Sequence, residues 1–221
     1  MTPPETLIFD LDGTLIDSAP DIHFAANVGL AAIGRPALDL VTVTSFIGNG
    51  VEVLMAKCLE ATGSCDDETH ARALEALLKA YAEQGAARTQ CYPGVVACLE
   101  RLQARGVKMG ICTNKVQVAA DDICHELGLD RFFTAIHGAR DTVAKKPAPD
   151  MLFNAVQAVG GTREDTLYVG DSDVDQKTAQ NARIPFVFFT GGYLNHPLSG
   201  EAPFMRFDDW SSLWPQTTKN P

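Results

Sequence analysis

The second half of this chain alternates regularly between helical and extended patterns, and that rhythm constrains the fold more than any other feature. Helical patterns are expected at 95–104, 116–127, 149–159 and 175–183, and strand patterns at 107–112, 134–137, 166–169 and 186–189. Glycine follows each of the first three helices within two residues, as is typical of helix ends. Such alternation indicates a mostly parallel sheet covered by helices on both faces. We therefore predict the α/β fold class.

The first half of the chain contributes one strand and then a long helical stretch. Leu7-Ile8-Phe9 is a short buried-strand pattern, stopped by the polar turn Asp10-Leu-Asp-Gly-Thr14. Residues 16–90 contain no convincing strand, and their apolar positions follow helical spacing. We expect a core made of residues 1–15 and 91–221 and a separate helical domain at 16–90, so the first strand must join the sheet across this insert.

Composition excludes several classes of protein. The formal net charge is −10, with no Lys/Arg run, so the chain repels phosphate backbones and we expect no nucleic-acid partner. No apolar run approaches the ~20 residues of a membrane span, and the start lacks the pattern of a signal peptide. The six cysteines show no zinc or disulfide spacing. We expect a soluble, unprocessed cytoplasmic protein with free thiols, whose oligomeric state the sequence does not determine.

Unusual polar side chains stand at the ends of three predicted strands. In an open parallel sheet, ligands bind in the crevice beyond the carboxyl ends of the strands. We expect one crevice to collect these residues: Asp10 and Asp12, Thr113 and Asn114, Asp171 and Asp175.

The spacing of Asp10 and Asp12 suits acid chemistry. Residues two apart in an extended segment lean to the same side, and neighbouring carboxylates raise the pKa of one of them. One would then be an anionic nucleophile and the other a proton carrier. The alternative is a simple turn, since Asp and Gly are favoured there on local grounds.

Asp171 and Asp175 are four residues apart where a helix begins, so they can share a face of it. Together with Asp10 they offer the hard oxygen ligands that Mg²⁺ takes. The alternative is an acidic helix N-terminus favoured by the helix dipole. With Asp173 and Asp165 nearby, the acids exceed what capping needs.

Lys146 precedes Pro147-Ala-Pro-Asp150, a rigid loop that holds a cation at the entrance to a helix with Asp150 as candidate N-cap. Beside several carboxylates, this lysine would keep the site ionised and neutralise a substrate phosphate. Thr113 and Asn114 offer a hydroxyl, an amide and backbone N–H groups for phosphoryl oxygens. Taken alone, a lysine is ordinary surface and Thr-Asn an ordinary loop pair.

Four short motifs resemble those of the haloacid dehalogenase superfamily, in order and at suitable separations. They are Asp10-Leu-Asp-Gly-Thr14, Thr113-Asn114, Lys146-Pro147 and Gly170-Asp-Ser-x-x-Asp175. The resemblance runs from the first strand to beyond residue 189 and implies a Rossmann-like core with a mobile helical cap at 16–90 between the first two motifs. Each motif is weak alone, whereas four in order are specific.

The resemblance implies a role for each matching residue. Asp10 would attack phosphorus to form an aspartyl-phosphate, and Asp12 would protonate the leaving oxygen and later activate water. Thr113 and Asn114 would bind the phosphoryl group, and Lys146 would balance its charge. Mg²⁺ would bind the Asp10 carboxylate, the Asp12 carbonyl and Asp171, with Asp175 behind these ligands. Asp12 also separates this chain from dehalogenases, which lack the second Asp.

For the substrate, Phe46–Met55 and Tyr92-Pro-Gly with Thr113-Asn-Lys115 are similar to bacterial phosphoglycolate phosphatases. We therefore expect a phosphatase of small phosphorylated metabolites, with 2-phosphoglycolate as the leading substrate. A sugar-phosphate phosphatase, a phosphomutase, a pyrophosphatase and a silent binding protein remain alternatives, since fold does not fix substrate. Val174 departs from the Asn often found at that position, and Asp173 adds a negative charge.

Overall fold

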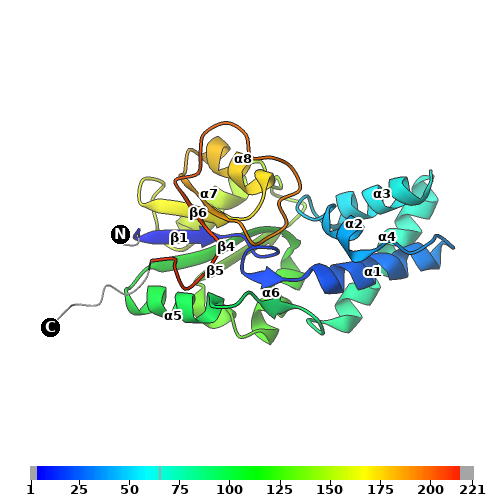
Figure 1. Ribbon diagram of the computed structural model, residues 1–221, viewed down its shortest axis with the longest axis horizontal. Helices are drawn as coiled ribbons and strands as arrows, with labels where there is room; N and C mark the ends of the chain where they lie inside the picture. Colours follow the sequence, from blue (N-terminus) through cyan, green and yellow to red (C-terminus); the bar gives the residue numbers. More distant parts are fainter. Residues whose placement is uncertain (1–3, 65, 215–221) are drawn as a thin grey trace.

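The computed structural model, shown in Figure 1, describes residues 4–64 and 66–214. Cys65 and the tail 216–221, which the sequence reading included, lie outside the described residues. The other five cysteines are free thiols, as expected. No helix in the described part of the chain combines the length and the apolar character needed to cross a membrane.

A six-stranded parallel sheet forms the centre of the molecule, with the strand order β5-β4-β1-β6-β7-β8. Its strands are β1 (Thr6–Phe9), β4 (Lys108–Val116), β5 (Ala135–Ala139), β6 (Thr166–Gly170), β7 (Phe186–Phe189) and β8 (Met205–Phe207). The first strand lies between β4 and β6, so the chain does return to it after the helical insert. The predicted α/β class is confirmed.

Helices cover both faces of this sheet, as Figure 1 shows. They are α5 (Val95–Ala104) and α6 (Gln117–Glu126) on one face, and α7 (Asp150–Ala158) and α8 (Asp173–Ala182) on the other. Alternate residues of β1 face opposite ways: Leu7 and Phe9 pack with α5 and α6, while Ile8 packs with α7 and α8. This double burial explains the unbroken apolar run of the first strand.

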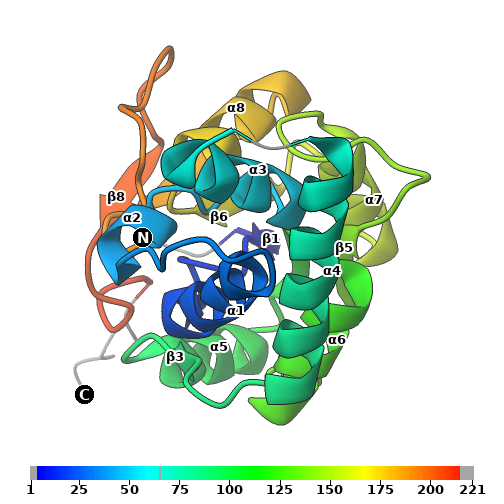
Figure 2. The same ribbon diagram turned by 90° about the vertical axis from the view of Figure 1, so that its right-hand side faces the viewer.

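Four helices follow β1 and gather over the carboxyl ends of the strands (Figures 1 and 2). They are α1 (Ala19–Ala32), α2 (Leu40–Thr44), α3 (Val51–Thr62) and α4 (Asp67–Gln84). They have a hydrophobic cluster of their own, centred on residues such as Leu30, Met55 and Leu77. The helical insert therefore has its own core, and its division from the sheet at residues 16 and 90 stays a prediction.

Two short strands join the insert to the core. In the antiparallel ribbon of β2 (Ile16–Asp17) and β3 (Gln90–Cys91), Ile16 pairs with Cys91 and Asp17 with Gln90. The sequence reading found neither strand, because two residues are too few for a periodic pattern. It also missed β8, which the structure places at the edge of the sheet beyond β7. Both differences arise from pairing between distant segments.

The ends of β4, α7 and α8 differ from the predicted ends, and these differences change where residues of the site lie. The strand β4 continues to Val116, so Thr113 and Asn114 lie inside it, where the pairing with β5 becomes irregular after Cys112. The helix α8 begins at Asp173, so Asp171 precedes it and does not share a helix face with Asp175. Asp150 is the first residue of α7 and not its cap.

Candidate active site

Asp10 follows β1 directly, at the carboxyl edge of the sheet. Its backbone N–H donates to the carbonyl of Val169 at 2.8 Å, which continues the pairing with β6 by one residue. Its side chain is buried, and Oδ1 accepts a hydrogen bond from Nζ of Lys146 at 2.7 Å. The first and third motifs, 136 residues apart in sequence, thus meet in one contact.

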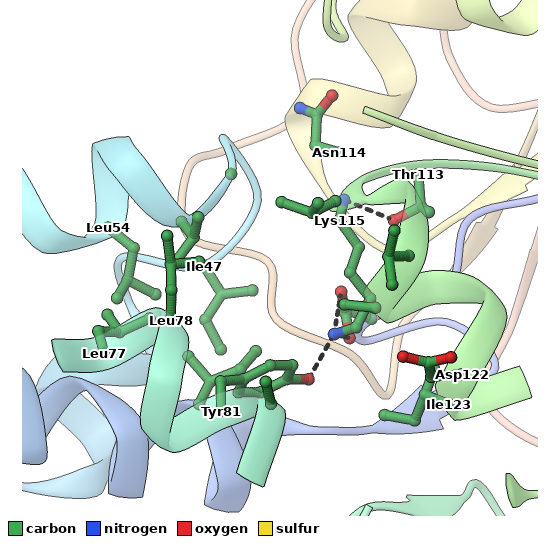
Figure 3. A pocket seen from close by; sticks show the side chains of 18 of the residues that line it. Ile47, Leu54, Leu77, Leu78, Tyr81, Thr113, Asn114, Lys115, Asp122 and Ile123 are labelled. Carbon is green, nitrogen blue, oxygen red and sulfur yellow. Dashed lines mark hydrogen bonds and ion pairs between the residues drawn. The ribbon is translucent and has the colours of Figure 1, made fainter. Parts of the chain in front are cut away.

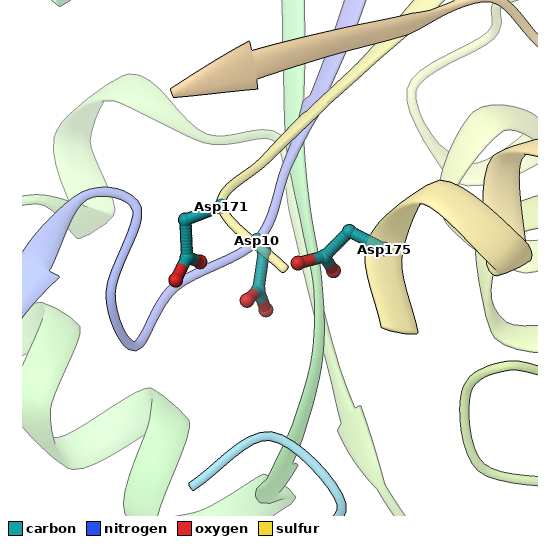
Figure 4. Close-up of side chains that lie close together, drawn as sticks. All are labelled: Asp10, Asp171 and Asp175. Carbon is teal, nitrogen blue, oxygen red and sulfur yellow. The ribbon is translucent and has the colours of Figure 1, made fainter. Parts of the chain in front are cut away.

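Asp171 and Asp175 lie on either side of Asp10 (Figure 4). One ligand oxygen from each of the three carboxylates lies within 4.8 Å of the others, and all three residues are buried. Asp171 accepts from Thr14 Oγ1 at 2.7 Å and from the backbone N–H of Tyr193 at 2.6 Å. We call Asp10, Asp171 and Asp175 the carboxylate cluster.

The two carboxylate oxygens of Asp175 accept hydrogen bonds from different parts of the structure. Its Oδ2 accepts from the backbone N–H and the hydroxyl of Ser172, which completes a capping box at the start of α8. Its Oδ1 accepts from Nζ of Lys146 at 2.7 Å and from the hydroxyl of Tyr168 at 2.9 Å. The capping alternative is therefore correct for this residue, and so is its placement beside Asp10.

The charges of the carboxylate cluster do not balance. Three buried carboxylates face one ammonium, Lys146, which leaves an excess of negative charge in a region of low dielectric. Burial and the nearby Asp175 raise the pKa of Asp10 to about 7, against the opposing effect of Lys146. Burial, Asp175 and Asp10 likewise raise the pKa of Asp171 well above its usual range.

A divalent cation would balance this excess of negative charge. Oxygen ligands from carboxylates suit a hard cation, and two positive charges would offset the excess that Lys146 leaves. Of the described residues, Asp10 and Asp171 are the carboxylates best placed to bind it directly, because each oxygen of Asp175 already accepts two hydrogen bonds, whereas each oxygen of Asp171 accepts one. Asp173 does not join them, since it pairs with Lys177 at 2.7 Å on its own helix.

Asp12 has different partners from Asp10. Its carboxylate accepts from Nζ of Lys115 at 2.9 Å and from the hydroxyl of Ser18 at 2.5 Å, and it is not part of the carboxylate cluster. The simple-turn alternative does not explain this buried ion pair, in which the Lys115 side chain is only 5% exposed. The expected binding of a metal by the Asp12 carbonyl stays a prediction.

Thr113 and Asn114 are both buried next to the cluster. The amide of Asn114 donates to the carbonyl of Lys146 at 3.1 Å and to that of Gly48 at 3.0 Å, and its oxygen accepts from the backbone N–H of Lys146 at 2.8 Å. In this arrangement the Asn114 side chain positions Lys146 and contacts the insert. Its expected contact with a phosphoryl group, like that of Thr113, stays a prediction.

A pocket of about 280 Å³ lies between the helical insert and the core. Asp10, Asp12, Thr113, Asn114 and Lys146 all line it, so the structure brings the predicted residues of the first three motifs together. Figure 3 shows the insert side of the pocket, where the labelled side chains Ile47, Leu54, Leu77 and Leu78 are apolar. A bound molecule would therefore meet most of its polar partners on the core side, and the hydroxyl of Tyr81 on the insert side.

Several residues of the site were not predicted from the sequence to have a role in it. Lys115, Tyr168 and Tyr193 each bond to a carboxylate of the site: to Asp12, Asp175 and Asp171, respectively. The hydroxyl of Tyr193 also accepts from the backbone N–H groups of Ser18 and Ala19, where α1 begins. Gly192 lies so close to Gly13 and Asp171 that no side chain fits there. The sequence Gly191-Gly192-Tyr193 was the signal that could have indicated this close approach.

Known proteins place this arrangement in a family. The sequence profile of the haloacid dehalogenase-like hydrolases matches residues 7–189. The chain belongs to this family. That assignment confirms the resemblance drawn from the four motifs.

Relatives and solved structures agree with the assignment. A phosphoglycolate phosphatase of Cereibacter sphaeroides is 42% identical over 193 residues, which cover 87% of this chain and 88% of that one. One from Rhodobacter capsulatus is 40% identical, with 94% of each chain covered. A crystal structure of a predicted phosphoglycolate phosphatase from Haemophilus somnus is 28% identical, with a TM-score of 0.89 over 96% of both chains. The predicted hydrolase class and fold are thus confirmed.

Proposed function

We propose that this protein hydrolyses 2-phosphoglycolate to glycolate and phosphate, with Mg²⁺ as its metal and Asp10 as its nucleophile. The observation that carries the chemistry is the contact of Asp10 with Lys146 inside a carboxylate cluster that borders a pocket with a second acid, Asp12. The substrate is supported by curated phosphoglycolate phosphatases that are 42% and 40% identical to this chain.

In the first step, a carboxylate oxygen of Asp10 attacks phosphorus, and the bond from phosphorus to the glycolate oxygen breaks. Asp12 gives its proton to that oxygen, so glycolate leaves as the alcohol and Asp10 carries the phosphoryl group. A carboxylate nucleophile divides a very slow displacement into two faster ones. Mg²⁺ would supply Lewis-acid stabilisation of phosphoryl oxygens and neutralise the cluster.

In the second step, Asp12 takes a proton from a water molecule, whose oxygen attacks phosphorus and releases Asp10 and inorganic phosphate. Lys146 holds the Asp10 carboxylate through a 2.7 Å contact and balances the charge of the phosphoryl group. Asn114 keeps the Lys146 loop in place, and Thr113 faces the pocket beside it. Positioning and charge neutralisation thus act together, as phosphoryl transfer demands.

We also propose that residues 16–90 are a cap that opens to admit substrate and closes to exclude water. Support comes from the separate hydrophobic cluster of α1–α4 and from the narrow β2–β3 ribbon that joins them to the core. Contacts of Gly48 with Asn114, and of Glu52 with Lys145 at 2.6 Å, would break on opening. Such gating is common where a reaction must be shielded from water.

Phosphate release from a substrate panel tests the proposal. The panel holds 2-phosphoglycolate, hexose phosphates, a sugar 1-phosphate, nucleotides and pyrophosphate, each with Mg²⁺ and with chelator. We expect metal-dependent turnover that is fastest on 2-phosphoglycolate. Faster turnover on sugar phosphates or pyrophosphate would keep the mechanism and replace the substrate, and isomerisation of the sugar 1-phosphate would indicate a mutase.

The matched control is Asp10→Asn, which keeps the shape of the side chain but removes the nucleophile. We expect phosphate release to fall by at least about a thousandfold while the far-UV circular dichroism spectrum is unchanged. Turnover within tenfold of the wild type would refute Asp10 as the nucleophile.

A further inference from the structure

Lys115 is a buried cation in the pocket without a role in the chemistry described above. The only lysine or arginine side chains among the described residues that line the pocket are Lys115 and Lys146. Lys146 is occupied by Asp10, Asp175 and the hydroxyl of Tyr168. Lys115 is therefore the cation that remains for a second anionic group of a substrate.

One hydrogen-bond donor remains free at this position. The ammonium of Lys115 has three hydrogens, and its acceptors are the two carboxylate oxygens of Asp12 at 2.9 and 3.2 Å and the hydroxyl oxygen of Tyr81 at 2.6 Å. Tyr81 thereby accepts, and its own hydroxyl hydrogen has no acceptor within residues 4–64 and 66–214. Figure 3 shows the two side chains meeting across the pocket, Lys115 from the core and Tyr81 from α4.

The position of Asp12 sets the distance to a substrate. Asp12 must reach the ester oxygen that leaves phosphorus, and Lys115 Nζ lies 2.9 Å from one of its carboxylate oxygens. In 2-phosphoglycolate, a single carbon separates that ester oxygen from the carboxylate. A substrate oriented for proton transfer from Asp12 therefore places its carboxylate within reach of Lys115.

The rest of the pocket leaves a carboxylate few alternatives. Apart from Tyr81, its insert side is apolar, and the acidic side chains of α6 that line it, Asp122 and Glu126, would repel an anion. A substrate carboxylate beside Asp12 would therefore meet the buried ammonium of Lys115 as its counter-charge.

We propose that Lys115, together with the hydroxyl of Tyr81 on α4, binds the carboxylate of the substrate and makes the enzyme selective for carboxylate-bearing phosphate monoesters. This proposal rests on the proposed phosphatase function and adds a reason for its substrate. Because Tyr81 belongs to the cap, the binding site for the carboxylate is complete only when the cap lies over the core.

A second role for Lys115 must be distinguished from this one. Through its ion pair, Lys115 also positions Asp12, and loss of that effect would slow every substrate whose leaving group needs a proton. Carboxylate binding instead affects only substrates that carry a carboxylate. The two roles differ in a ratio: kcat/KM for 2-phosphoglycolate divided by kcat/KM for 2-hydroxyethyl phosphate, which has an alcohol in place of the carboxylate.

The experiment measures this ratio for the wild type, Lys115→Met, Lys115→Arg and Tyr81→Phe. We expect Lys115→Met to lower the ratio ten- to a hundredfold, mainly through KM for 2-phosphoglycolate, as loss of a charge-assisted hydrogen bond does. Lys115→Arg should retain most of the ratio, and Tyr81→Phe should lower it about threefold to tenfold. Lys79→Met, whose exposed lysine pairs with Glu83 on α4 and does not line the pocket, should keep the ratio within about twofold.

Parallel losses on both substrates in Lys115→Met, with the ratio unchanged, would overturn the proposal and leave Lys115 as a residue that positions Asp12. If Lys115→Met does not fold, an unchanged ratio in Tyr81→Phe together with equal kcat/KM values for both substrates in the wild type would overturn it. If the wild type ignores 2-phosphoglycolate, the proposed function fails, and the same ratio for 3-phosphoglycerate and glycerol 3-phosphate tests Lys115 independently.

Discussion

Nζ of Lys146 lies 2.7 Å from Oδ1 of Asp10, and the lysine side chain is only 2% exposed. The same ammonium lies 2.7 Å from Asp175, so one cation links the first, third and fourth motifs. Its removal would leave buried carboxylates without their counter-charge, which is among the more costly changes in a protein interior. This contact makes the site sensitive to single substitutions.

Lys146→Met should therefore affect both stability and activity. We expect the free energy of unfolding of the metal-free protein to fall by about 3–5 kcal/mol, and phosphate release to be lost. Chemical denaturation followed by circular dichroism measures the first effect. The matched control is Lys145→Met, at a half-exposed surface pair with Glu52, which should change stability by less than about 1 kcal/mol. Similar losses in both variants would contradict the buried-pair interpretation.

The raised pKa of Asp10 predicts how Mg²⁺ and pH act together. Asp10 has a pKa of about 7 in the folded metal-free protein and 3.8 in the unfolded chain, so protonation favours the folded state. The stability that this contributes is present below the unfolded value and is lost as pH rises through about 7. Mg²⁺ binds the ionised carboxylate, and its stabilising effect should grow over the same range.

Thermal unfolding checks this expectation. It is measured with and without about 10 mM Mg²⁺, at one pH below 7 and at one pH above 7. We expect a clearly larger rise in Tm at the higher pH than at the lower one. The Asp10→Asn variant cannot titrate there, so its pH dependence should be weaker. An equal rise at both pH values in the wild type would contradict a metal bound by Asp10.

Gly192 should control the position of Asp171. A Cβ at this position would collide with the carbonyl of Gly13 and with the Asp171 side chain, both parts of the site. We expect Gly192→Ala to raise the Mg²⁺ concentration needed for half-maximal activity by at least about tenfold. Gly160→Ala is the control: it has a positive φ of 67° but open space, and should cost about 1–2 kcal/mol without altering the metal requirement. Identical metal titrations of the two variants would refute the prediction.

Gly48 should influence the choice of substrate more than the chemistry. Its φ of 126° favours glycine, its carbonyl accepts from Asn114, and it lines the pocket. In Gly48→Ala we expect relative rates across the substrate panel to change by about threefold to tenfold, because a strained loop alters how the cap closes. Gly34→Ala, in another loop of the insert, has open space around it and should leave the relative rates unchanged. A uniform loss on all substrates in Gly48→Ala would contradict this prediction.

Local patterns predicted much of the core because they reflect local causes. The apolar run Leu7-Ile8-Phe9 gives a strand buried on both faces, and its polar ending places Asp10 at the carboxyl edge of the sheet. The helix 95–104 was predicted with the ends that the structure shows. The acids around Asp175 are visible in the sequence, and the parallel fold gathers them there.

The partners of each carboxylate, in contrast, were decided only by the tertiary structure. Sequence grouped Asp10 with Asp12, yet Asp10 pairs with Lys146 and Asp12 with Lys115, across 136 and 103 residues. The packing of α4 over the core turns the hydroxyl of Tyr81 to Lys115, a contact that spacing along the helix does not show. Spacing along a chain fixes direction and burial within one element, but contacts between elements depend on how the sheet orders its strands and where the insert packs. The sequence therefore determined which groups the site contains, and the tertiary structure determined which of them touch.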